Sequence, residues 1–175
     1  MDQKKFQHET FESQNFIEVD FSNYSFQNTT FIDCTFNNCN ISNVNLKNSQ
    51  FQNINFIDCK LLGLNFSECD KFLISFNFEK SLISNCNFSE LIMKETNFEK
   101  CQIFDCDFIN TNLTKTDFTD SDLKGSYFEN SNLSFTKFDH AINYSINPNK
   151  NNFRCTKFSM PEVIGLLDCF NIEIN

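Results

Sequence analysis

Nine cysteines and two histidines are the residues of this 175-residue chain whose types could do chemistry. Thiolates and imidazoles are preferred zinc ligands, and a thiolate beside a base is a nucleophile. The spacing supports neither role, because no Cys-x-x-Cys pair occurs and His8 and His140 stand at no recognisable distance from a nucleophile or carboxylate. Three glycines leave no glycine-rich phosphate loop. We therefore expect no catalytic residue, no cofactor and no metal ion, and so no enzyme.

Most of the cysteines occupy one position of a five-residue pattern, two residues before a large apolar residue. These are Cys34, Cys39, Cys59, Cys86, Cys101 and Cys106, and Cys69 continues the same phase. Buried thiols of this kind act as small apolar fillers. Cys39 and Cys59 are twenty residues apart, as are Cys86 and Cys106, so each pair is expected to stack on neighbouring coils. We interpret these cysteines as reduced structural thiols, with a chance disulfide or metal contact as the alternative.

The pattern that must position these thiols is a five-residue repeat. Every fifth residue from Phe6 to Phe66 is Phe, Leu or Ile, and after a slip of two residues within 67–72 the period resumes from Leu73 to Phe138. Five residues advance an α-helix by about 500°, which leaves no apolar stripe, and an odd period puts successive side chains on opposite faces of a flat strand. A chain that turns a corner once per pentad sends every central residue inward.

The second block gives a hint of the number of sides, because Phe recurs there every ten residues with Ile, Met or Leu between. Four pentads per coil would place Phe on two opposite sides, and identical residues would then stack at about 4.8 Å, the spacing between strands. The residue before each central one is often Asn or Asp, which satisfy backbone groups at repeated turns. An aggregation-prone Gln/Asn-rich tract is the competing interpretation, and the strict spacing opposes it.

The order small residue, Asn or Asp, Leu or Phe, then two variable residues resembles the motif of the pentapeptide-repeat family, over about residues 6–158. The resemblance implies an all-β fold, a right-handed quadrilateral parallel β-helix of about seven coils. We assign residues 1–158 to this β-helix, with a bulge or kink at the phase slip in 67–72, and residues 159–175 to a C-terminal helix and tail.

A different pattern begins after Phe158. Ser159 and Glu162 match a capping box, and apolar residues follow at helical spacing, which predicts an α-helix over about 160–169 that closes the end of the rod. The apolar residues are Val163, Ile164, Leu166, Leu167 and Phe170. They exceed one narrow stripe, so we expect them to form the interface of a two-fold homodimer. A purely monomeric cap is the alternative.

The net charge of −9 disfavours direct binding to nucleic acid or to an anionic membrane. No stretch approaches the length of a transmembrane helix, and the chain starts with polar residues, so we expect a cytoplasmic protein. The segment from Ile146 to the apolar helix resembles the end of the Qnr/McbG branch of the family, to which MfpA is related. That resemblance implies a dimeric rod that mimics DNA and binds DNA gyrase or topoisomerase IV, affecting quinolone sensitivity.

Acidic residues on two sides of the predicted rod could form the interaction surface of such a mimic. They are Glu90, Asp107 and Glu129 on one side, and Glu79, Glu99, Asp117 and Asp120 on the opposite side. The second side also carries Lys80, Lys100 and Lys137, so the acidic charge is spread. The chain departs from Qnr proteins in lacking long loops between coils, with only the slip and a turn near Pro148, which favours an MfpA-like action. A structural or protein-interaction scaffold with no role at topoisomerases is the alternative function.

Overall fold

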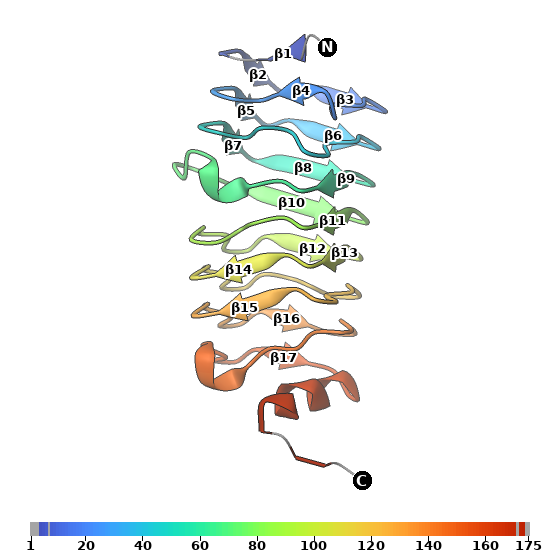
Figure 1. Cartoon of the computed structure of the whole chain (residues 1–175), viewed down its shortest axis with the longest axis vertical. Coiled ribbons are helices and arrows are strands. Elements are labelled where there is room, and N and C mark those ends of the chain that lie inside the picture. The colour runs from blue at the N-terminus through green and yellow to red at the C-terminus, as the bar shows by residue number, and fades with distance from the viewer. Residues whose placement is uncertain (1–3, 7, 171, 174–175) are drawn as a thin grey trace.

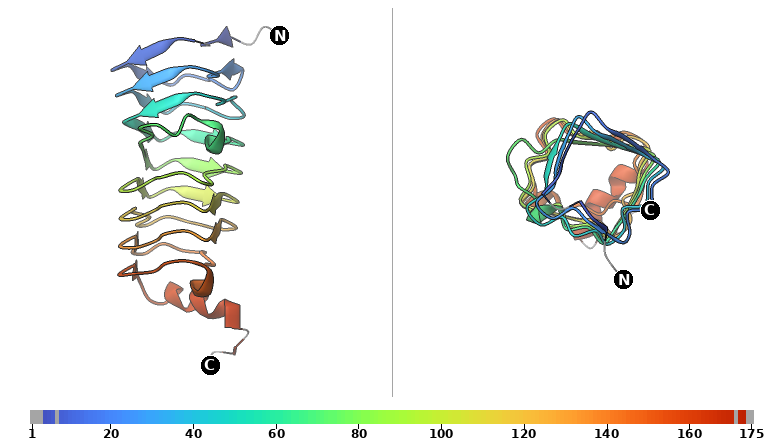
Figure 2. Two further views of the ribbon diagram at one scale, coloured as in Figure 1. Left: turned by 90° about the vertical axis from the view of Figure 1, so that its left-hand side faces the viewer. Right: turned by 90° about the horizontal axis from the view of Figure 1, so that it is seen from above.

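Figure 1 shows a rod in which the chain winds from the N-terminus at one end to a short helix at the other. The computed structural model describes residues 4–6, 8–170 and 172–173. Seen along its axis in Figure 2, each coil is four-sided and the coils superpose. Every strand pair is parallel and joins residues twenty apart, or twenty-two apart across the phase slip. The predicted four-sided parallel β-helix of about seven coils is confirmed.

The strands form four faces, each named here after one of its strands. The β5 face comprises β2 (Thr10–Glu12), β5 (Thr30–Ile32) and β7 (Gln50–Gln52). The β10 face comprises β3 (Asn15–Ile17), β6 (Thr35–Asn37), β8 (Ile54–Ile57), β10 (Phe76–Glu79), β12 (Asn97–Glu99), β16 (Lys137–Phe138) and β17 (Lys157–Phe158). The β11 face comprises β9 (Lys60–Leu62), β11 (Leu82–Ser84) and β13 (Gln102–Phe104). The β14 face comprises β1 (Lys4–Lys5), β4 (Tyr24–Ser25), β14 (Asp107–Ile109) and β15 (Tyr127–Glu129).

The core is a set of stacked side chains along the axis. Phe88, Phe108 and Phe128 stack with ring centroids 5.1 and 4.8 Å apart and nearly parallel planes. Rings from opposite faces meet edge to face across the axis, as Phe108 and Phe118 do at 86°. Both geometries suit the aromatic quadrupole, and burying each ring contributes roughly 1.5–3 kcal/mol. Aromatic stacking and burial therefore hold the coils together.

One residue in nearly every pentad turns the corner between two faces. Corner residues have φ between 50° and 65°, a left-handed conformation that Asn and Asp tolerate better than most side chains. Asn38, Asn48 and Asp58 are examples. The Asn or Asp before each central residue has a second role, since Asp117 Oδ1 accepts the N–H of Thr119 at 3.0 Å. These two positions explain why the polar residues of the repeat are so often Asn and Asp.

The phase slip differs from the sequence prediction in its detail. Leu73, predicted to restart the inward series, is 57% exposed and left-handed, with φ 57°. The series restarts instead at strand β10, where Phe76 pairs with Ile54 and lies buried with its ring 5.5 Å from that of Phe51. Helix η1 (Phe66–Glu68) precedes the extra residues, which project from the wall of the rod as the loop seen in Figure 1. Pairing across the slip, with Phe78 opposite Phe56, sets this register.

The C-terminal end differs from the sequence prediction in helix type and capping. A turn at η2 (Pro148–Lys150) lies where the sequence predicts one, and helix η3 (Glu162–Phe170) has 3₁₀ rather than α geometry. The predicted capping box is absent, because the hydroxyl of Ser159 accepts the N–H of His140 from the preceding coil, at 3.1 Å. The helix still covers the end of the rod, as Figure 2 shows. Among the residues that the structure describes, no helix is long and apolar enough to span a bilayer.

Candidate functional site

The thiols of the inward series lie in the core and not at a site. Seven of the nine cysteines are buried, and Cys155 and Cys169 are the two that are not. Burial raises the pKa of Cys69 and of Cys101 to about 12. Hydrogen bonding to Cys39, together with burial, raises the pKa of Cys59. Cys59, Cys69 and Cys101 therefore stay protonated at neutral pH, which makes them poor nucleophiles and poor metal ligands. Hydrogen bonding to Cys59 instead lowers the pKa of Cys39 to about 7, although the Cys39 side chain is buried.

The histidines and carboxylates assemble no metal centre in the described part of the chain. No group of three or more His, Cys, Asp or Glu side chains is placed to hold an ion there. His8 and His140 both occupy exposed corner positions, with φ 65° and 56°. Their role in the fold is to turn the chain between faces.

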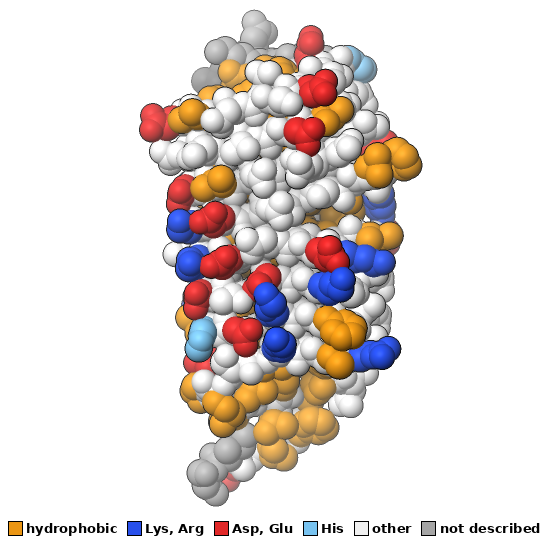
Figure 3. Space-filling view, turned by 180° about the vertical axis from the view of Figure 1, so that it is seen from behind, with side chains coloured by type: hydrophobic (Ala, Val, Ile, Leu, Met, Phe, Trp, Pro, Cys, Tyr) orange, Lys and Arg blue, Asp and Glu red, His pale blue; other side chains and the backbone are white. Residues whose placement is uncertain are grey.

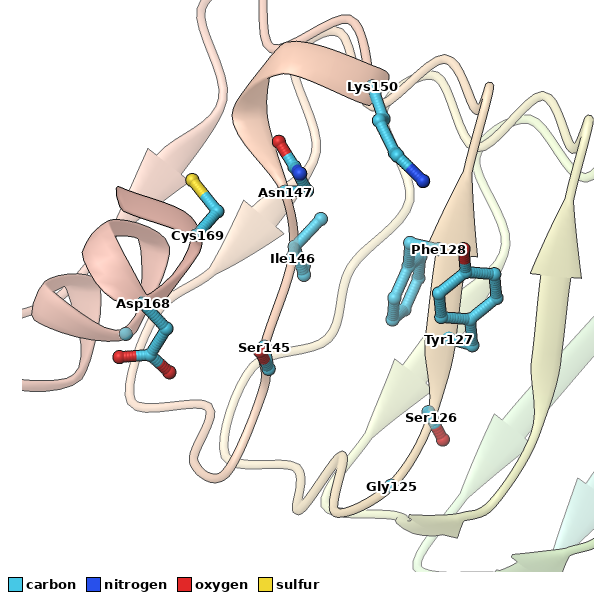
Figure 4. Close-up of a pocket in the computed structure, with 11 residues that line it drawn as sticks. Gly125, Ser126, Tyr127, Phe128, Ser145, Ile146, Asn147, Lys150, Asp168 and Cys169 are labelled. Atoms are coloured by element: carbon cyan, nitrogen blue, oxygen red, sulfur yellow. The ribbon is translucent and has the colours of Figure 1, made fainter. Parts of the chain in front are cut away.

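A cavity of about 420 Å³ lies between the last coil and helix η3, as the close-up in Figure 4 shows. Here the backbone hydrogen bonding between successive coils is interrupted, since no backbone hydrogen bond among the described residues joins Tyr127–Phe128 to Ser145–Asn147. Two polar groups of the lining contact the same carboxylate: Lys150 Nζ lies 2.6 Å from Glu129 Oε1, and the Tyr127 hydroxyl donates to Glu129 Oε2 at 2.8 Å.

The β14 face carries the predicted acidic residues Glu90, Asp107 and Glu129. They do not form one column, that is, they do not occupy equivalent positions on successive coils. Asp107 precedes a central residue, Glu129 follows one, and Glu90 occupies a corner. Glu90 pairs with Lys71 at 3.0 Å, and Glu129 pairs with Lys150. Lysines from adjoining segments therefore neutralise two of the three carboxylates on this side.

The predicted acids of the β10 face are also paired. Glu79 contacts Lys80 at 2.9 Å, Glu99 contacts Lys100 at 2.8 Å, and Asp117 contacts Lys137 at 2.6 Å. The nearby ammonium groups lower the pKa of Glu79. Asp120 is the member of this group with no ion pair among the described residues. The acidic charge of this face is thus largely balanced.

Among the described residues all six ion pairs lie beyond residue 70, so the N-terminal coils carry carboxylates without ion pairs, which the sequence prediction missed. Among the described residues, these exposed acids form no salt bridge: Glu12, Glu18, Asp20, Asp33 and Asp58. Figure 3 shows acidic side chains near that end without basic neighbours on the visible face. The ion pairs elsewhere join residues that are adjacent or 19 to 21 apart.

The predicted dimer residues divide between the core and the surface. Leu166 packs against the core, and Val163 is half-buried. Ile164, Leu167 and Phe170 are exposed, and Figure 3 shows hydrophobic side chains gathered at this end of the rod. One side of helix η3 therefore closes the rod while its other side presents apolar groups to solvent.

Two family models match the chain. A pentapeptide repeat region matches residues 9–76, and pentapeptide repeats in eight copies match residues 106–142. None of the curated proteins compared with the chain matches it significantly.

Solved structures match over the whole length. Two trypsin-treated variants of QnrB1, described as a plasmid-mediated fluoroquinolone resistance protein, superpose with TM-scores of 0.68 and 0.60. Each is 16% identical, each match covers 100% of this chain, and they cover 94% and 95% of the QnrB1 chains. At this identity the likeness shows a shared fold.

Proposed function

The chain belongs to the pentapeptide-repeat family, and from this premise we propose that it is a non-enzymatic rod that binds type II topoisomerase, such as DNA gyrase or topoisomerase IV, in the cytoplasm. It occupies part of the DNA-binding surface of the enzyme and so changes supercoiling activity and sensitivity to fluoroquinolones. The observation that carries the proposal is a rod whose N-terminal coils present unpaired carboxylates. Its whole length matches the fold of a fluoroquinolone resistance protein.

The negative charge of the N-terminal coils is what would attract them to a DNA-binding enzyme. A protein that binds DNA presents positive charge to phosphates, and an acidic rod is attracted to the same surface. Carboxylates that already pair with lysine add little to that field, whereas Asp33 and Asp58 act over about 8–10 Å at physiological salt. Asp107 and Asp120, the unpaired members of the predicted surface, extend the negative field towards the C-terminal coils.

The test is a DNA gyrase supercoiling assay over a range of protein concentrations, with and without a fluoroquinolone. We expect a change in supercoiling at micromolar protein that weakens as salt rises. D33N/D58N should weaken the effect about tenfold. Asn suits both corners, since the neighbouring corners are Asn53 and Asn38.

E79Q/E99Q is the matched control, because it removes the same formal charge from the β10 face beyond the phase slip and leaves Asp33 and Asp58 in place. It should weaken the effect less than D33N/D58N does. Equal effects of the two double variants would reject the N-terminal surface. No effect of the wild-type protein on gyrase would reject the topoisomerase proposal as a whole.

A second candidate function is a protein-interaction scaffold with no topoisomerase partner. The six ion pairs favour it, since they neutralise much of the acidic surface that a DNA mimic needs. A scaffold would leave supercoiling unchanged at every salt concentration, so the same assay separates the two functions.

A further inference from the structure

Large apolar side chains lie exposed along the C-terminal part of the β5 face. This part begins at the projecting loop and continues through the parallel bridges that join Ile92, Asn112, Asn132 and Asn152. The exposed side chains are Phe72 (74%), Leu73 (57%), Ile92 (64%) and Phe135 (46%). They form two groups, the loop residues with Ile92 and, two coils further on, Phe135. Two coils correspond to about 10 Å along the axis.

Neither burial nor backbone preference explains these residues. Leu73 and Phe135 have φ 57° and 62°, a conformation that is sterically unfavourable for bulky side chains. Among the described non-glycine residues with positive φ they are the only large apolar ones, and the others are mainly Asn, Asp, Glu and Lys. An exposed Phe at a corner where Asn would suit the backbone better points to a role outside folding.

The same surface is basic within an acidic chain. Lys94 and Arg154 form no salt bridge among the described residues, and Lys115 pairs with Glu95 at 2.7 Å. Arg154 Cζ lies 5.9 Å from the centre of the Phe135 ring, so a guanidinium and an aromatic face are presented together. Figure 3 shows hydrophobic and basic side chains interleaved along the right-hand edge.

We propose that this surface, formed by Phe72, Leu73, Ile92, Lys94, Phe135 and Arg154, docks an acidic segment of a partner protein that carries apolar side chains. The apolar side chains of the segment cover the two exposed groups, and its carboxylates meet Lys94 and the donors of Arg154. The separation of about 10 Å along the axis is close to two turns of an amphipathic helix. The site is independent of the topoisomerase proposal, because its charge is opposite to that of the acidic coils.

The test is selection of phage-displayed random twelve-residue peptides on the wild-type protein, followed by affinity measurement of the selected peptides by fluorescence anisotropy. We expect enrichment of peptides that combine Asp or Glu with Leu, Ile or Phe. I92N/F135N should bind them at least about tenfold more weakly. Asn already occupies the column of Ile92 at Asn112 and Asn132, and it suits the left-handed corner of Phe135. This double variant should therefore fold normally, which circular dichroism checks.

Two controls make the result specific. I17N removes an equally exposed Ile on the β10 face, where Asn37 is the next residue of the column, and should leave peptide affinity unchanged. K94E/R154E should lose binding of acidic peptides by a similar factor to I92N/F135N. The proposal is overturned if no peptide is enriched, if the enriched peptides are basic, or if I92N/F135N binds them as well as the wild type. Loss of self-association in I92N/F135N, seen by light scattering, would assign the surface to a second copy of the chain and also overturn it.

Discussion

Asp117 shows how one side chain links two coils. Its carboxylate bonds the N–H and hydroxyl of Thr119 in its own coil and the ammonium of Lys137 in the next. Partial burial raises the pKa of Asp117, but these hydrogen bonds outweigh burial and lower it from 3.8. A depressed pKa stabilises the fold above the unfolded pKa, and this contribution is lost as the pH falls below 3.8 through the lower folded value.

We therefore expect D117N to fold normally, because Asn97 is the preceding residue of this column. At pH 7 it should be less stable by up to about 1 kcal/mol. The difference from wild type should shrink below pH 3.8, and chemical denaturation over a pH series measures it. A constant difference across that range would show that the charge of Asp117 plays no part.

Tyr144, unlike Asp117, carries a polar group that lowers the stability of the fold. Its hydroxyl is buried beneath the cap and has no hydrogen-bond partner among the described residues, and burial raises its pKa to about 12. A buried hydroxyl without a partner costs about 1–3 kcal/mol. Y144F keeps the ring, which lies 5.6 Å from those of Phe138 and Phe158, and should raise the free energy of unfolding by about 1 kcal/mol. A lower unfolding free energy for Y144F would mean that the hydroxyl has a partner in solution.

At the scale of the element, the aromatic columns hold the coils together. Phe108 lies fully buried between Phe88 and Phe128, with no loop nearby that could fill a cavity. F108A should therefore lower the free energy of unfolding by about 3–5 kcal/mol, measured by denaturant unfolding. F108L should cost less, because Leu113 and Leu123 show that the neighbouring faces accept Leu at the central position. A loss under 1 kcal/mol for F108A would contradict a close-packed column.

The sequence could predict the elements in which the local five-residue pattern agrees with the hydrogen-bonded pairing between successive coils. Phe108 and Leu113 point inward because every pentad repeats the same local geometry. Leu73 shares that spacing yet lies outside, since strand β10 takes its register from β8 and the two extra residues must leave the wall. Ser159 fits a capping box, but a backbone N–H one coil away uses its hydroxyl. Contacts between residues twenty apart decide both outcomes, and a local pattern does not contain them.

The sequence prediction of the acidic surface was limited in the same way, because it too used only local positions. Charges were predicted by face, whereas the neutralisation of Glu90 and Glu129 depends on lysines from other segments of the chain. Lys150 reaches Glu129 from a turn that follows the last regular coil. Lys71 reaches Glu90 from the projecting loop. Neither lysine belongs to the column of its partner, so a count by face could not find it.

For the whole molecule, the apolar side of helix η3 bears on the oligomeric state. Ile164, Leu167 and Phe170 are exposed together, and we propose that they pair with the same residues of a second copy around a two-fold axis. L167D should convert the dimer to a monomer in size-exclusion chromatography with light scattering. Leu166 faces the core, so L166D should instead destabilise the rod. A wild-type chain that elutes as a monomer would end the dimer proposal.

The parallel pairing of residues twenty apart also limits how the gene for such a rod can change length. Removing residues 102–121 would join Cys101 directly to Asp122. Because Gln102 and Asp122 occupy equivalent places on successive coils, every remaining residue would keep its face and its column. Removing a single pentad would instead rotate everything downstream by a quarter turn, so that each surface would face a new direction relative to the N-terminal coils. Deletions and duplications should therefore be tolerated in units of one full coil, even though the repeat visible in the sequence is four times shorter.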